Sequence, residues 1–93
     1  MKNRGKKTLG NEYLERMIKN LPVLRAAAGL TQAQLGEKVG VSRQTIVVIE
    51  NEKSPLTWSL YLAMVCVFGL YQESLELLNI LDIFSADYLI SDL

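Results

Sequence analysis

The 93-residue chain has no histidine and only one cysteine, Cys66. A single cysteine cannot form an intramolecular disulfide, and without histidines or a CxxC pair a zinc site is not expected. Cys66 lies in an apolar run, where a buried structural thiol is far more common than a nucleophile. The sequence also has no glycine-rich phosphate-binding loop. We therefore expect no enzymatic activity, no cofactor and no metal.

Long hydrophobic runs are absent as well. The longest apolar stretch, residues 60–70, is about half of the roughly 20 residues that a membrane-spanning helix needs. The basic start of the chain, MKNRGKK, is not followed by the apolar segment of a secretory signal peptide. Hydrophobic residues nevertheless make up 49% of the chain. These features predict one soluble, cytoplasmic domain that does not enter a membrane.

Positive charge is missing from the second half of the sequence. All ten lysine and arginine residues lie in residues 1–53, together with five acids, so this part carries a net charge of +5. Residues 54–93 contain the other five acids and no base, a net charge of −5. Such segregation indicates that one part meets a polyanion while the other has a different role. Chance segregation with a solvated acidic tail is the alternative.

The N-terminal third has the signals of an arm followed by two short helices. Residues 1–10 contain two glycines and mostly polar or basic residues, which predicts a basic flexible arm. Asn11 is suited to cap a first helix. Pro22 should interrupt this helix, because proline is tolerated only in a first turn. Asn20 is therefore predicted to cap a second helix over residues 21–28.

The segment TQAQLGEKVGVSRQTIVVIE, residues 31–50, contains two helix starts separated by a glycine joint. Thr31 and Gln34 form a capping box, Gly40 is suited to end the first helix, and Ser42 can cap the second. The apolar positions predicted to face inward are Ala33, Leu35, Val39, Ile46 and Ile49, with Val41 filling the joint. Two short helices joined by a turn of about three residues that contains glycine are typical of a helix-turn-helix. Two ordinary core helices are the alternative.

Residues 21–69 resemble the phage-repressor/Cro-like (Xre) family of helix-turn-helix transcriptional regulators. The resemblance is carried by LTQAQLGEKVGVSRQTI and by the IEN that follows. It implies an all-α fold, a lambda-repressor-like bundle of about five short helices placed here in residues 11–70. In this family the second and third helices form the unit that reads DNA.

The side-chain chemistry and the resemblance together identify candidate DNA contacts. A recognition helix enters the major groove with its N-terminal residues facing the base edges, and Ser42, Arg43, Gln44 and Thr45 lie in that first turn. Arg43 can pair bidentately with guanine and Gln44 with adenine, and a good pair discriminates by about 1–3 kcal/mol. Val48 either touches a thymine methyl group or only packs. The resemblance further implies phosphate contacts by Gln32, Asn51 and Lys53, and a structural ion pair between Arg25 and Glu50. It also implies that Gln32 braces the recognition helix.

One position departs from the family pattern. The family usually has Asn-Gly-Lys after the third helix, with the glycine in a left-handed turn, whereas this chain has Asn51-Glu52-Lys53. Glutamate at positive φ costs about 1 kcal/mol or more relative to glycine. Either Asn51 adopts that conformation or the turn differs. The charge of Glu52 near the expected phosphate path suggests that affinity depends more on the basic arm.

The remaining residues suggest a buried helix and a tail. Residues 57–68, TWSLYLAMVCVF, are apolar on nearly every side, which predicts a helix buried on every side. Residues 71–93 form an acidic, apolar extension in which Leu75, Leu78 and Ile83 are predicted to cover that helix and Ser85 to cap a final turn. The extension either completes the core or pairs with a second copy or another protein.

Two classes of function follow from the sequence. The first is a sequence-specific regulator, a repressor, that binds double-stranded DNA as a homodimer on a palindromic operator. A dimer places two recognition helices about 34 Å apart, on two half-sites, and a single small module buries too little surface for strong specificity. The second is an interaction module, such as the antitoxin of a toxin–antitoxin pair, whose C-terminal tail binds a protein partner.

Overall fold

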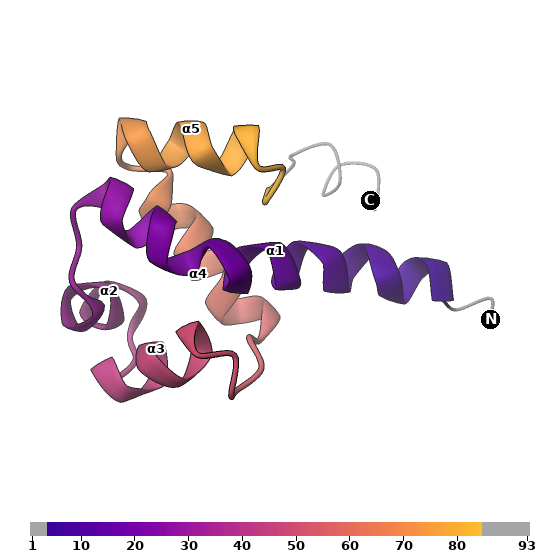
Figure 1. The fold of residues 1–93 in the computed structure, drawn as a ribbon, viewed down its shortest axis with the longest axis horizontal. Helices are drawn as coiled ribbons and strands as arrows, with labels where there is room; N and C mark the ends of the chain where they lie inside the picture. The colour runs from indigo at the N-terminus through magenta and orange to yellow at the C-terminus, as the bar shows by residue number, and fades with distance from the viewer. Residues whose placement is uncertain (1–3, 85–93) are drawn as a thin grey trace.

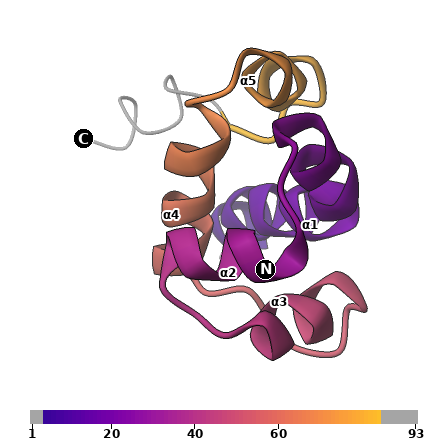
Figure 2. The same ribbon diagram turned by 90° about the vertical axis from the view of Figure 1, so that its left-hand side faces the viewer.

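The computed structural model describes residues 4–84, with side chains from residue 12 onward, and this range forms five helices and no strand. The helices are α1 (Arg4–Ala28), α2 (Gln32–Val39), α3 (Arg43–Glu50), α4 (Trp58–Phe68) and α5 (Gln72–Ile80). The expected all-α bundle is therefore confirmed. In Figure 1, α1 runs between α5 on one side and the α2–α3 pair on the other. Figure 2 shows α4 on the outside of the bundle, beside α1.

The N-terminal prediction was wrong, because one helix takes the place of an arm and two helices. Residues 4–10 are helical, so the flexible arm is not observed over this range. Neither Asn11 nor Asn20 begins a helix, since both lie inside α1. The side-chain Nδ2 of Asn20 instead donates to the backbone oxygen of Arg16 at 2.8 Å.

Pro22 lies within α1 and does not end it. An internal proline removes one helical hydrogen bond and costs about 3 kcal/mol. The residues around it offset this cost, because Met17, Leu21 and Leu24 are fully buried and each contributes about 1.5–3 kcal/mol. The two halves of α1 run in different directions in Figure 1, as expected for a helix with an internal proline. Tertiary packing thus overrides the local stop signal.

The helix α4 is not buried on every side. Its inner face, formed by Tyr61, Met64, Val67 and Phe68, lies in the core. On its outer face Trp58 and Leu62 keep 38% and 40% of their surface exposed, and Cys66 is exposed as well. The prediction that Cys66 is buried is therefore wrong within the single chain, and this chain alone does not cover every side of α4.

The first part of the C-terminal extension completes the core. Leu78 and Ile83 are buried, as predicted, whereas Leu75 is 39% exposed. The α4–α5 joint is held by two buried hydrogen bonds that the sequence did not predict. The Ser74 hydroxyl donates to the backbone oxygen of Phe68 at 2.7 Å, and the Tyr61 hydroxyl donates to the backbone oxygen of Ile83 at 2.7 Å. Ser85 lies outside the described residues.

Candidate functional site

The helices α2 and α3 begin at the caps that the sequence predicts. The Thr31 hydroxyl accepts the backbone N–H of Gln34 at 3.0 Å, and the side chain of Gln34 accepts the backbone N–H of Thr31 at 2.9 Å. The Ser42 hydroxyl accepts the backbone N–H of Thr45 at 3.2 Å. These local bonds fix where each helix starts and therefore which side chains occupy the first turn of α3.

The joint between α2 and α3 depends on two glycines. Gly40 adopts a left-handed conformation with φ of +85°. The backbone N–H groups of Gly40 and Val41 both donate to the backbone oxygen of Gly36, each at 2.8 Å. A Cβ atom on Gly36 would lie 2.7 Å from the backbone oxygen of Val41. The close approach of α2 to the turn therefore requires glycine at position 36.

The importance of Gly36 was missed by the sequence analysis, which placed Ala33 on the inner face of α2. Ala33 is exposed, whereas Leu35 and Gly36 are buried. The sequence nevertheless contained a signal for this close contact, a glycine inside a short predicted helix. Glycine in a helix interior costs about 1 kcal/mol relative to alanine, so its presence in an eight-residue helix indicates a close backbone contact.

Three elements are tied together at Glu50, the last residue of α3. Its carboxylate accepts hydrogen bonds from Nε of Arg25 at 2.7 Å and from Nη2 at 3.2 Å. Nε2 of Gln32 donates to the same carboxylate at 3.0 Å, and Nη1 of Arg25 donates to the backbone oxygen of Leu30 at 3.1 Å. The implied Arg25–Glu50 ion pair is thus present. The hydrogen bond from Gln32 to Glu50 also braces the third helix, as the resemblance implies, although Glu50 could not be identified as its partner from the sequence. The network fixes α3 relative to α1 and α2.

The first turn of α3 presents its polar side chains outward. Ser42, Arg43 and Gln44 are exposed, while Thr45 and Val48 are half-buried. The hydroxyls of Ser42 and Thr45 lie 3.1 Å apart and share a hydrogen bond. Within the described residues, the Arg43 and Gln44 side chains have neither a hydrogen-bond partner nor an ion-pair partner. Their donors are therefore available to an external ligand.

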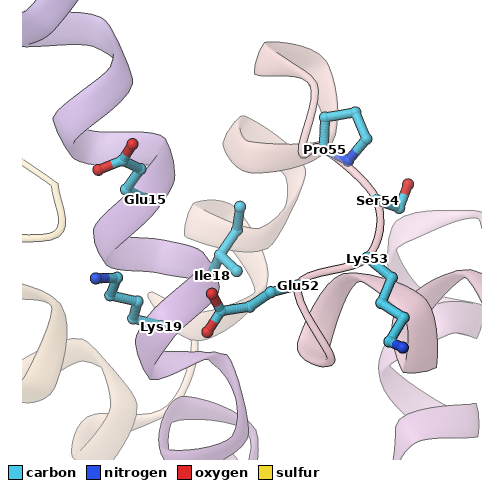
Figure 3. A pocket seen from close by; sticks show the side chains of 7 residues that line it. All are labelled: Glu15, Ile18, Lys19, Glu52, Lys53, Ser54 and Pro55. Carbon is cyan, nitrogen blue, oxygen red and sulfur yellow. The ribbon is translucent and has the colours of Figure 1, made fainter.

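The turn after α3 places the strained conformation on Glu52. Glu52 has φ of +61°, whereas Asn51 has φ of −85°, so Asn51 does not take the left-handed position. Asn51 and Lys53 are both exposed. Figure 3 shows the Glu52 side chain pointing toward α1 and that of Lys53 pointing away from it. The negative charge is thus turned away from the side on which Lys53 projects.

The cavity in Figure 3 lies between α1 and this turn, and it has a volume of about 450 Å³. Its lining residues are Glu15, Ile18, Lys19, Glu52, Lys53, Ser54 and Pro55. Two acids and two bases balance in charge there. The cavity shows no preference for one class of charged ligand.

Replacing Glu52 with glycine is expected to raise the free energy of unfolding by about 1 kcal/mol, because glycine adopts positive φ without steric cost. Denaturant unfolding measures the change. Glu52→Ala is the matched control, since it removes the charge but keeps the strained backbone, and it should give little of the gain. Equal stabilisation by both variants would show that the charge, rather than φ, is the cause.

The geometry defines a class of protein: an all-helical bundle in which a glycine joint holds two short helices and exposes the first turn of the second. Residues 21–78, more than half of the chain, match the helix-turn-helix domain family. The chain belongs to this family. All the candidate site residues lie inside the matched range.

One curated relative supports the same assignment. An uncharacterized HTH-type transcriptional regulator of Methanothermobacter thermautotrophicus is 46% identical over 59 residues, which make up 62% of this chain and 81% of that protein. No solved structure matches the chain. Among the described residues, none of the helices combines the length and the hydropathy that crossing a membrane would require.

Proposed function

We propose that this protein is a sequence-specific DNA-binding transcriptional regulator of the phage-repressor/Cro-like type. One observation carries the proposal: Arg43 and Gln44 are exposed and have no side-chain partner among residues 4–84. They lie at the start of a helix that the glycine joint and the Glu50 network hold in place. The relative named as an HTH-type transcriptional regulator supports it. In the major groove, the first turn of α3 faces the base edges.

The polar residues of this turn are suited to two roles: Arg43 and Gln44 can recognise bases, and Ser42 and Thr45 can contact a phosphate or a base edge. Arg43 has the planar donor pair that matches guanine O6 and N7, and Gln44 has the donor and acceptor that match adenine N6 and N7. Ser42 and Thr45 share a hydrogen bond, and the Ser42 hydroxyl also accepts the backbone N–H of Thr45. The Ser42 hydroxyl therefore keeps one hydrogen-bonding position and the Thr45 hydroxyl keeps two, suited to a phosphate or a base edge. Val48 is half-buried and offers at most a methyl contact with thymine.

Phosphate contacts would come from both ends of the α2–α3 unit. Gln32 lies in the first turn of α2, where backbone N–H groups favour an anion. One N–H of its side-chain amide holds Glu50, which leaves the other available. Asn51 and Lys53 are exposed beyond the end of α3. A phosphate held at each end would fix the angle at which α3 enters the groove.

We further propose that the protein acts as a homodimeric repressor on a palindromic operator. Two copies related by a two-fold axis can place their α3 helices in successive major grooves, about 34 Å apart. A single module of this size gives limited specificity, because it buries only about 600–1,000 Å² of protein surface. A compact dimer seated on a promoter excludes other proteins from the same DNA, which favours repression over activation.

A second candidate function is a protein-interaction module, of which an antitoxin is one example. The observation that favours it is the exposed apolar surface of α5, where Leu75 is 39% and Ile80 74% exposed. The two functions are compatible within one chain. Co-expression with the product of a neighbouring gene distinguishes them, since an interaction module should co-purify with that product through α5.

Arg43→Ala is expected to relax base preference at one position in each half-site. The loss of a bidentate pair corresponds to about 1–3 kcal/mol, or roughly 5- to 150-fold weaker binding of the preferred sequence. Fluorescence anisotropy with a panel of single-base variants measures this effect. Lys53→Ala is the contrasting variant: it should weaken binding to all sequences equally and reduce the salt dependence by about one phosphate contact. Uniform weakening by Arg43→Ala would show that Arg43 touches only the backbone.

A further inference from the structure

The outward face of α3 continues beyond its first turn as an apolar surface. Val47 follows Arg43 by four residues and Gln44 by three, and Val48 follows Gln44 by four. Residues at these spacings lie on the same face of a helix. The two valines therefore lie one turn further along α3 than the side chains that we propose to contact bases. We call Val47 and Val48 the α3 valine pair.

The α3 valine pair does not belong to the hydrophobic core, although both side chains are half-buried. Among the described residues, half-buried apolar side chains on neighbouring helices, such as Leu60 on α4, pack against the core, whereas Val47 and Val48 do not. The contribution of α3 to the core comes instead from Ile46 and Ile49, which are both buried. Packing of the fold therefore does not account for the two valines.

Val47 lies on the side of α3 that faces away from the bundle. Thr45 and Ile49 line a groove between α3 and α4, and each of them is two residues from Val47. Two residues correspond to about 200° around a helix, so Val47 lies on nearly the opposite side of α3. In both Figure 1 and Figure 2, α3 lies at the lower edge of the bundle, with α1, α2 and α4 above it. The side that carries Val47 is therefore the side that a DNA duplex would meet.

The α3 valine pair is unfavourable for the helix itself. Residues 45–49, TIVVI, are all β-branched, and a helix restricts the χ1 rotation of such side chains, which lowers their helix propensity. Burial offsets this cost for the two isoleucines, and burial against an external ligand would offset it for the valines. The same restriction holds each valine in one main rotamer, so the pair forms a preorganised apolar surface.

The major groove of DNA offers one apolar partner for such a surface. The base edges there carry hydrogen-bond donors and acceptors, and the apolar group that projects among them is the C5-methyl group of thymine. A valine placed against a donor or acceptor would remove it from water without replacing its hydrogen bond, which is unfavourable. We propose that the α3 valine pair recognises pyrimidine 5-methyl groups, and that Val47 is a further residue that determines DNA specificity. This inference rests on the proposed function, in which Arg43 and Gln44 set the register on the base pairs.

The spacing along α3 limits where these methyl groups lie. Four residues correspond to about 6 Å of helix, which is less than two base-pair steps of about 3.4 Å each. The methyl groups should therefore lie within two base pairs of the bases that Arg43 and Gln44 contact. Cytosine methylated at C5 carries the same methyl group on the same ring atom. A 5-methylcytosine at such a position should therefore bind more tightly than an unmodified cytosine.

Base analogues that differ by one methyl group test the proposal. The probe is the operator obtained by selection from a random DNA pool, with each thymine of a half-site replaced in turn by deoxyuridine. At one or more positions the wild-type chain should bind about 3- to 5-fold more weakly, as expected when one buried methyl group is lost. Cytosine and 5-methylcytosine at the same position form a second pair of probes, and the methylated base should bind more tightly by a similar factor. Fluorescence anisotropy at fixed salt measures all four affinities.

Val47→Ala and Val48→Ala test whether this methyl effect depends on the α3 valine pair. Neither variant removes a core contact and alanine favours a helix, so both should fold. A variant that loses the methyl contact should bind the thymine and deoxyuridine probes with equal affinity. Val23→Ala is the matched control, because Val23 is exposed on α1 and its loss should leave the ratio of the two affinities unchanged.

The outcomes separate this inference from the proposed function. Sequence-specific binding that no deoxyuridine substitution weakens would overturn the inference and leave the proposed function standing. A methyl effect that both valine variants retain would do the same, as would a selected half-site without a thymine in the expected range. A folded wild-type chain that enriches no DNA sequence would refute both.

Discussion

Replacing Glu50 with alanine is expected to lower the free energy of unfolding by about 3–5 kcal/mol. The Glu50 side chain is only 7% exposed and that of Arg25 20% exposed, so the variant leaves a largely buried guanidinium without its carboxylate. The variant also removes the oxygen that accepts the hydrogen bond from the Gln32 side chain. A loss of this size is a large share of the roughly 5–15 kcal/mol that stabilises a typical domain. Urea unfolding followed by circular dichroism measures it.

Two further variants separate the causes of this loss. Glu50→Gln keeps the size and one acceptor but removes the charge, and it should lose part of the stability. The double variant Arg25→Met with Glu50→Met removes both charges, and it should recover much of what Glu50→Ala loses, because a buried pair can be replaced by apolar groups at little cost. A loss below about 1 kcal/mol in Glu50→Ala would contradict the structural role of the pair, since it would match only a surface salt bridge.

Gly36→Ala is expected to destabilise the fold by about 3 kcal/mol, although alanine normally favours a helix. The added Cβ would lie 2.7 Å from the backbone oxygen of Val41 and 3.2 Å from that of Ser42. Neither contact can be relieved by a rotamer change, so the cost falls at the upper end of the 1–3 kcal/mol that is typical of overpacking. The turn would have to open, which would tilt α3 and weaken DNA binding as well. Thermal and denaturant unfolding, together with DNA affinity, measure both effects.

The control for Gly36→Ala is Ala33→Gly in the same helix. Ala33 is exposed, so this variant should lose only the helix propensity of about 1 kcal/mol. Comparing the stability of the two variants separates the effect of helix propensity from the effect of packing against the turn. Stabilisation by Gly36→Ala would show that α2 does not approach the turn as closely as the structure indicates.

Local signals predicted the α2–α3 unit correctly. The caps at Thr31 and Ser42 and the stop at Gly40 are interactions within a few residues, so they are readable from short stretches of sequence. The same approach failed in α1, where Pro22 and Asn20 gave equally clear local signals. Burial of side chains against distant helices outweighed them there, and sequence periodicity does not report that balance.

The candidate site was only partly predictable. The Arg25–Glu50 pair came from the resemblance, because residues 25 positions apart give no local signal. Neither the hydrogen bond from Gln32 to Glu50 nor the positive φ of Glu52 could be read from composition or spacing. The exposure of Trp58 and Leu62 was missed for a similar reason: apolar residues on every side of a helix indicate burial, but they do not show which sides the rest of the chain covers.

Selection of bound sequences from a random pool of duplex DNA tests the central claim most directly. If the first turn of α3 reads base edges, the wild-type chain should enrich an inverted repeat whose half-site centres are about 10 base pairs, or a multiple of this, apart. The same selection with folded Arg43→Ala should lose information at one position in each half-site. Failure of the folded wild-type chain to enrich any sequence would contradict the account.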